Sequence, residues 1–130
     1  MFVRLQLLLV LVVLFTSVPF VNAEEPLESY RWQNRLIVYH LADSAAEAGK
    51  LRELISQTER ELEDRDLLFI EMSAPLLKRF RVSSGRSTFI LLGKDGSEKG
   101  RQSPQLDLGA FFKRIDQMPM RRAEMREKGR

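Results

Sequence analysis

A lysine between two glycines is the first feature of this sequence that could do chemistry. Lys94 lies between Gly93 and Gly96, directly after the apolar run Thr88–Leu92. A phosphate-binding loop needs its lysine directly after the last glycine, followed by serine or threonine and then a helix. Here the lysine comes before the second glycine, and Asp95-Gly96 is a strong signal for a hairpin turn. We therefore expect a turn and no nucleotide site.

The other chemistry-bearing residue types are sparse. The chain has no cysteine and one histidine, His40, so thiol catalysis and thiolate metal sites are excluded, and we expect no metal and no cofactor. His40 ends a predicted strand, where a structural histidine with one hydrogen bond is the expectation. A row of carboxylates, interleaved with Arg60 and Arg65, favours a solvated helix face. These carboxylates are Glu59, Glu61, Glu63, Asp64 and Asp66.

Serines and aromatic residues receive structural interpretations as well. Ser83, Ser84 and Ser97 are predicted loop serines, and no glycine-x-serine-x-glycine nucleophile motif surrounds them. Tyr30 and Trp32 precede the first predicted strand by a few residues. We expect both rings to pack over the open end of the core.

The first residues have the order of a secretory signal. Arg4 is followed by an apolar stretch, residues 7–15, and then by Pro19 and the small residue Ala23. We expect a signal peptide over 1–23 with cleavage after Ala23, the alternative being an uncleaved N-terminal anchor. The exported protein, periplasmic or secreted, would then keep no membrane span. Its charge of about +2, from the formal +3, is too balanced to suggest nucleic acid binding.

The remaining chain suits one domain, over 24–120, followed by a charged, solvated tail over 121–130. Residues 35–41 and 66–72 predict interior strands, and the helix between them makes the strands parallel. Ser44 and Glu47 have the spacing of a capping box at the start of this helix. Its apolar stripe consists of Leu51, Leu54, Ile55, Thr58 and Leu62.

The second half predicts a hairpin and a closing helix. Residues 75–80 could form one or two helical turns, and strands over 88–92 and 98–101 flank the glycine turn. Ser103-Pro104 fits a helix start. The stripe of this last helix is Leu106, Ala110, Phe111, Ile115 and Met118. The expected fold class is α/β, with a mixed sheet and flanking helices in the order βαβ and then ββα.

Three stretches resemble the family called domain of unknown function 4174. They are "YRWQNRLIVYH" (Tyr30 to His40), "FILLGKDGSEKGR" (Phe89 to Arg101) and "IDQMPMRRAEMR" (Ile115 to Arg126), and the resemblance extends from Pro26 to Arg126. This domain occurs in small bacterial exported proteins and in secreted sushi-repeat proteins. The resemblance implies a thioredoxin-like fold that is distantly related to peroxiredoxins.

The peroxiredoxin comparison implies a site without its nucleophile. Arg86 matches the arginine that steadies peroxide and thiolate, but the stretch Asp43–Glu47 stands where the reactive cysteine should be. Serine or glutamate cannot replace a thiolate in peroxide reduction. Ser87 stands where thioredoxins place a cis-proline, so the dithiol mechanism finds no support either.

Two functions remain open at this point. The first is a non-catalytic binding or interaction domain whose partner is an envelope protein or a small anionic ligand. The second is an enzyme of non-thiol chemistry that uses the Arg86 region. The candidate anion or partner site comprises Arg86, Lys94, Arg101, His40, Asp43 and Glu47. A buried pair of Arg86 with Glu47 or Asp43 would close this site, and a free Arg86 would leave it open for an anion.

Overall fold

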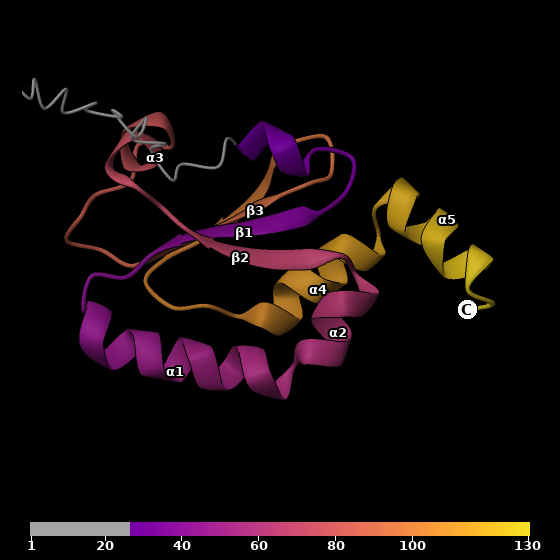
Figure 1. The fold of residues 1–130 in the computed structure, drawn as a ribbon, viewed down its shortest axis with the longest axis horizontal. Coiled ribbons are helices and arrows are strands. Elements are labelled where there is room, and N and C mark those ends of the chain that lie inside the picture. The colour runs from indigo at the N-terminus through magenta and orange to yellow at the C-terminus, as the bar shows by residue number, and fades with distance from the viewer. Residues whose placement is uncertain (1–26) are drawn as a thin grey trace, which may run out of the picture.

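The computed structural model describes residues 27–130, and Figure 1 shows them as one layered domain around a β-sheet. The expected signal peptide, residues 1–23, lies outside the described residues, as does Pro26. The sheet has four strands in the order β2-β1-β3-β4. Their bounds are β1 Arg35–His40, β2 Leu67–Glu71, β3 Thr88–Leu92 and β4 Glu98–Gln102.

The strand pairing confirms a mixed sheet. β1 runs parallel to β2, with Arg35 opposite Leu67, and antiparallel to β3, with His40 opposite Thr88. β3 and β4 form the expected hairpin, in which Gly96 takes a positive φ of 82°. The expectation of an interior β2 is wrong, because β2 lies at the edge of the sheet. Its Leu68 is 40% exposed.

Helices cover both faces of the sheet (Figure 1). One face carries α1 (Ser44–Gln57), α2 (Glu59–Asp64) and α4 (Leu108–Asp116), and the other carries a short 3₁₀ helix (Leu27–Tyr30) and α3 (Ala74–Arg79). The alternation of β1 and β3 side chains sends successive residues into opposite layers. The buried members of the first layer include Ile37, Leu51, Leu62, Phe89, Leu91, Phe111 and Ile115. Those of the second are Leu27, Leu36, Val38, Met72, Ile90 and Leu92.

The helix boundaries correct three details of the sequence analysis. The first long helix is interrupted at Thr58, whose hydroxyl donates to the Leu54 carbonyl at 2.7 Å. Asp43, not Ser44, is the N-cap of α1, so no Ser44–Glu47 capping box forms. α4 begins at Leu108, directly after its N-cap Asp107, and not at Ser103-Pro104. Both aspartates accept a backbone N–H in the first turn, and this bond stabilises each helix start.

The expected solvated tail is instead largely a helix. α5 (Pro119–Glu127) packs at the end of the sheet, beside α4, and its one buried residue is Arg121. Charged side chains therefore hold α5 against the domain, because the helix buries no apolar side chain. Within residues 27–130 no helix is long and apolar enough to cross a bilayer.

Candidate functional site

Ser87 is at the centre of the region that the peroxiredoxin comparison marks. It lies just before β3 and is 2% exposed. Its hydroxyl accepts the Ala42 N–H at 2.9 Å and donates to Glu47 Oε2 at 2.5 Å. Ser87 thereby ties the loop after β1 and the first turn of α1 to the start of β3. Because this hydroxyl belongs to a residue that is almost wholly buried, it is not accessible to a substrate.

Arg86 does not take part in this hydrogen bond and binds Ser103. Its Nε donates to Ser103 Oγ at 2.8 Å, and its Nη2 donates to the Ser103 carbonyl at 3.4 Å. Ser103 Oγ donates in turn to the Ser87 carbonyl at 2.5 Å. The expectation of a buried pair between Arg86 and a carboxylate is therefore wrong, because Arg86 is exposed and bonds the loop after β4.

His40 and Asp43 serve local structure. His40 Nε2 lies 2.8 Å from the Ser84 carbonyl, so this nitrogen donates, which confirms a histidine with a structural hydrogen bond. Asp43 Oδ1 accepts from the Ala46 N–H as the cap of α1. We call this end of the sheet, with His40, Glu47, Arg86, Ser87 and Ser103, the serine end.

The other two candidate residues lie elsewhere. Lys94 follows β3 and Arg86 precedes it, so the length of the strand separates them. Arg101 lies on β4, opposite Ile90 of β3, and its guanidinium binds Glu98 at 2.8 Å. The structure therefore groups His40, Glu47 and Arg86 at one end of the sheet, and it does not bring Lys94 to them.

A groove of 370 Å³ adjoins the serine end. It lies between α1 and the segment after β4, and the charged residues Glu47 and Lys50 are among those that line it. Most of its lining is apolar and consists of Leu41, Leu51, Leu54, Phe89 and Leu106. Its volume falls within the range of about 300–1,000 Å³ that is typical of ligand pockets.

The opposite end of the sheet holds a network of ion pairs that sequence reasoning missed. Arg35 is 1% exposed, and its two terminal nitrogens bind the two oxygens of Glu124 on α5, at 3.1 and 3.2 Å. Lys94, 9% exposed, binds Glu124 and Asp66, each at 2.8 Å. Burial opposes the charge of Glu124, but the hydrogen bonds from Arg35 and Lys94 outweigh it and lower the pKa of this carboxyl.

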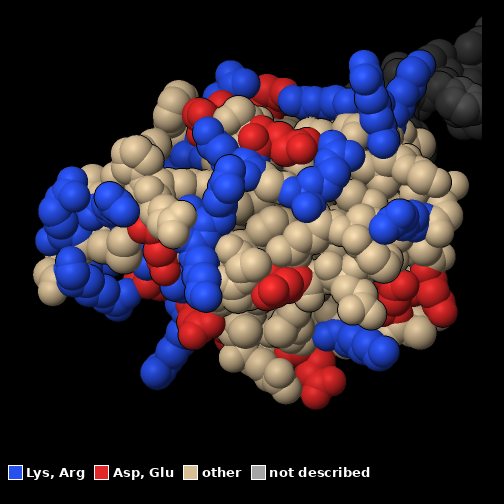
Figure 2. Space-filling model, turned by 180° about the vertical axis from the view of Figure 1, so that it is seen from behind, with Lys and Arg blue, Asp and Glu red and all other residues tan. Residues whose placement is uncertain are grey.

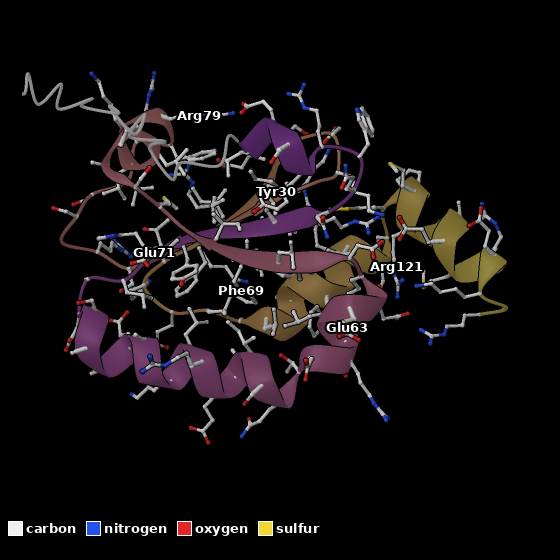
Figure 3. All side chains as sticks on the ribbon, in the orientation of Figure 1. Tyr30, Glu63, Phe69, Glu71, Arg79 and Arg121 are labelled. Carbon is white, nitrogen blue, oxygen red and sulfur yellow. The ribbon has the colours of Figure 1, made fainter. Side chains whose placement is uncertain are left out.

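A second centre of the network surrounds Arg121. Figure 3 shows this side chain where α5 meets α2 and α4. Its guanidinium binds Asp64 at 2.7 Å and Asp116 at 3.0 Å, and Arg65 binds Asp116 at 2.9 Å. The Arg121 bond holds the pKa of Asp64 well below its usual range. Burial would raise the pKa of Asp116, but the bonds from Arg65 and Arg121 lower it. We call these two centres together the charged end.

The charged end corrects two interpretations made from the sequence. Asp64, Asp66 and Arg65 are not merely parts of a solvated face, and Arg121 and Glu124 do not belong to a solvated tail. A signal for the network was present in the sequence. Each of the three stretches that carry the family resemblance contributes to it, with Arg35 from the first, Lys94 from the second, and Asp116, Arg121 and Glu124 from the third.

Comparison with known families supports the resemblance in the second half of the chain. Residues 72–124 match the family model described as Domain of unknown function (DUF4174). This part of the chain is similar to that family. The matched segment contains Lys94 and reaches Glu124, whereas the first stretch, Tyr30 to His40, lies before it. No curated protein and no solved structure matches the chain.

The described residues hold no metal-binding cluster. Within residues 27–130, no group of three or more histidine, cysteine or acidic side chains is arranged to hold an ion. The acids of the charged end bind arginines and lysines, which occupy their oxygens.

Proposed function

We propose that this protein is an exported, non-catalytic interaction domain on a thioredoxin-like frame. The frame is supported by the sheet order β2-β1-β3-β4 with β3 antiparallel to both neighbours. It is also supported by the placement of α1 and α4 on one face and α3 on the other (Figure 1). Export rests on the N-terminal pattern of charged, apolar and small residues.

The hydrogen bond between Ser87 and Glu47 is the observation that carries the non-catalytic part of the proposal. In the thiol enzymes of the resemblance, this region must present a reactive, accessible sulfur. Here a buried hydroxyl and a carboxylate bind each other at 2.5 Å, and the chain has no cysteine. The polar groups of the region hold three segments together.

The alternative, an enzyme of non-thiol chemistry, has less geometric support. Such an enzyme would need His40, Asp43 and Arg86 to converge on one substrate. Each of the three side chains instead binds a different local partner. Of four cavities formed by the described residues, none is lined by His40, Asp43 or Arg86.

The groove between α1 and the segment after β4 is the proposed binding surface at this end. Its apolar lining suits an apolar group of a ligand or an extended peptide, and the exposed Lys50, which also lines it, can bind an acidic group. The proposal does not require Arg86 or Lys94, which lie outside this groove.

A matched pair of charge reversals tests this function. Lys50 and Arg52 are both exposed on α1, but only Lys50 lines the groove. Purified protein is used to capture partners from the envelope fraction of its own host. A specific partner should be lost with Lys50→Glu and kept with Arg52→Glu. Equal capture by both variants would contradict binding at this groove, and turnover of peroxide by purified protein would contradict the non-catalytic assignment.

A further inference from the structure

Two of the largest exposed apolar side chains flank one groove at the charged end. Trp32 is 63% exposed and Met120 is 43% exposed, and both line a groove of 230 Å³. The expectation that Trp32 packs over the core is therefore wrong, whereas Tyr30 does pack against the second apolar layer. The tryptophan is also the only one in the chain.

The backbone holds Trp32 in this position against a local preference. Its φ is +66°, in the left-handed region that bulky residues avoid. The hydrogen bond from the Trp32 N–H to the Lys94 carbonyl, at 2.7 Å, fixes this conformation. Such strain is retained when surrounding contacts determine it, and it gathers at binding sites. A strained residue that presents its ring to solvent gains little from packing, so its placement points to a role outside the fold.

The groove itself is apolar on one side and rigid beneath. Met118, Pro119 and Met120 supply the apolar side from the start of α5, and Arg35 and Lys94 lie among the lining residues. The ion pairs of these two cations with Glu124 fix α5 and hence the distance across the groove. At 230 Å³ the groove is smaller than the roughly 300–1,000 Å³ of small-molecule sites, which favours one anchoring side chain over a whole cofactor.

The rim of the groove carries excess positive charge. Lys99 lines it, Arg31 lies against Gly96 of the adjoining turn, and Arg122 follows Pro119 by one helical turn. Figure 2 shows Lys and Arg at this end of the molecule, at the left of that view, with Asp and Glu between them, and it shows further Lys and Arg across the rest of the face. Lys99 and Asp95 form an ion pair with each other at 3.2 Å, so the excess positive charge comes from Arg31 and Arg122. Within residues 27–130, no carboxylate forms an ion pair with Arg122.

We propose that the groove between Trp32 and Met120 docks an acidic segment of a partner protein, with one apolar side chain of that segment anchored in the groove. Methionines adapt their shape to the anchor, and an exposed tryptophan supplies a large contact area. The cations on the rim attract the flanking acids and exclude basic segments. This surface is distinct from the groove beside Lys50, at the other end of the sheet.

The fluorescence of the single tryptophan reports occupancy directly. The probe is a synthetic peptide with one leucine between runs of glutamate. Added to the purified protein, it should shift Trp32 emission to the blue in a saturable way. Lys99→Glu and Arg122→Glu should each weaken binding about fivefold, because an attraction becomes a repulsion. Arg52→Glu, the same charge change at a distant exposed position, should leave the affinity unchanged.

Several outcomes would overturn the proposal. They are an equal shift from a leucine between lysines, an equal shift from a serine between glutamates, and unaltered affinity in Arg122→Glu. Anionic lipid vesicles that shift the emission where the glutamate peptide does not would assign the surface to a membrane instead. A shift that depends on protein concentration alone would assign it to a second copy of this chain. Lys50→Glu, which tests the other groove, should bind the peptide as wild type does.

Discussion

The two ends of the β-sheet are closed by different chemistry. At the serine end, hydroxyls and a backbone N–H join three segments, and the arginine is exposed. At the charged end, two nearly buried cations, Arg35 and Lys94, share the carboxylate of Glu124. A hydrogen bond contributes about 1 kcal/mol, or about 1.5–3 kcal/mol where one partner is charged, whereas a buried ion pair that loses one partner leaves an uncompensated charge. The difference places the more sensitive interactions far from the region that resembles a catalytic site.

The largest effect on stability is expected at Glu124, in the charged end. Glu124→Ala leaves Arg35 and Lys94 buried without their shared carboxylate, so we expect the free energy of unfolding to fall by about 3 kcal/mol or more. Urea unfolding followed by circular dichroism measures this. Glu127→Ala, at an exposed position of the same helix, should change it by less than about 0.5 kcal/mol. Similar values for the two variants would show that the network contributes little.

The second largest effect is expected from acid, which should weaken the charged end. Glu124, Asp64 and Asp116 all have a lowered pKa in the folded protein, so the folded state binds fewer protons than the unfolded chain. Their stabilisation is present above the unfolded values, near pH 4, and is lost as the pH falls through the lowered folded values. The urea midpoint should therefore fall between about pH 5 and pH 2. The fall should be shallower in Asp64→Asn, and an unaltered slope in this variant would contradict the assignment.

The serine end should respond less strongly. Ser87→Ala removes the donor to Glu47 and the acceptor of the Ala42 N–H, which we expect to cost about 1–3 kcal/mol of unfolding free energy. Ser84→Ala, at an exposed position whose carbonyl and not its hydroxyl binds His40, serves as the control. A loss with Ser87→Ala that exceeds the loss with Glu124→Ala would reverse the comparison between the two ends.

A gain in stability is expected at Trp32. Asparagine tolerates a φ of +66° better than tryptophan, and little packing is lost at a side chain that is 63% exposed. Trp32→Asn should therefore raise the unfolding free energy by about 1 kcal/mol while abolishing peptide binding, which calorimetry can measure. Gln33→Asn should give no such gain. Destabilisation by Trp32→Asn would show that the ring packs on the fold.

The smallest effect is expected at Arg86. Its guanidinium is exposed and bonds Ser103, so Arg86→Ala should cost less than about 1 kcal/mol. Sulfate should change the melting temperature of the wild type and of Arg86→Ala equally, because Lys94 lies at the far end of β3 and cannot join Arg86 around an anion. A sulfate effect confined to the wild type would restore the anion site.

Local patterns in the sequence predicted most of the elements. The apolar runs at Arg35 and Thr88 became β1 and β3, and Asp95-Gly96 became the hairpin turn, because these signals depend on neighbouring residues alone. The edge position of β2 was not predictable from its apolar composition. Neither was the helix after Pro119, because α5 buries a charged residue in place of an apolar stripe.

The candidate site was predictable only in part. The sequence positions of His40 and Arg86 at neighbouring strand ends brought them to one end of the sheet. Lys94 was misplaced because its partners, Asp66 and Glu124, are 28 and 30 residues away, and no local pattern marks such pairs. Ion pairs between distant residues depend on the tertiary structure, and a charge-rich segment is otherwise typical of a solvated surface.

The pair of Arg35 and Glu124 also constrains the order in which the chain can fold. Its members are separated by 89 positions, so the pair forms only when distant parts of the domain meet. Until α5 docks, closing the sheet around Arg35 would bury an uncompensated guanidinium, at a cost of several kcal/mol. We therefore expect this end of the sheet to close last during folding. The docking of α5 would then be the step that completes the domain.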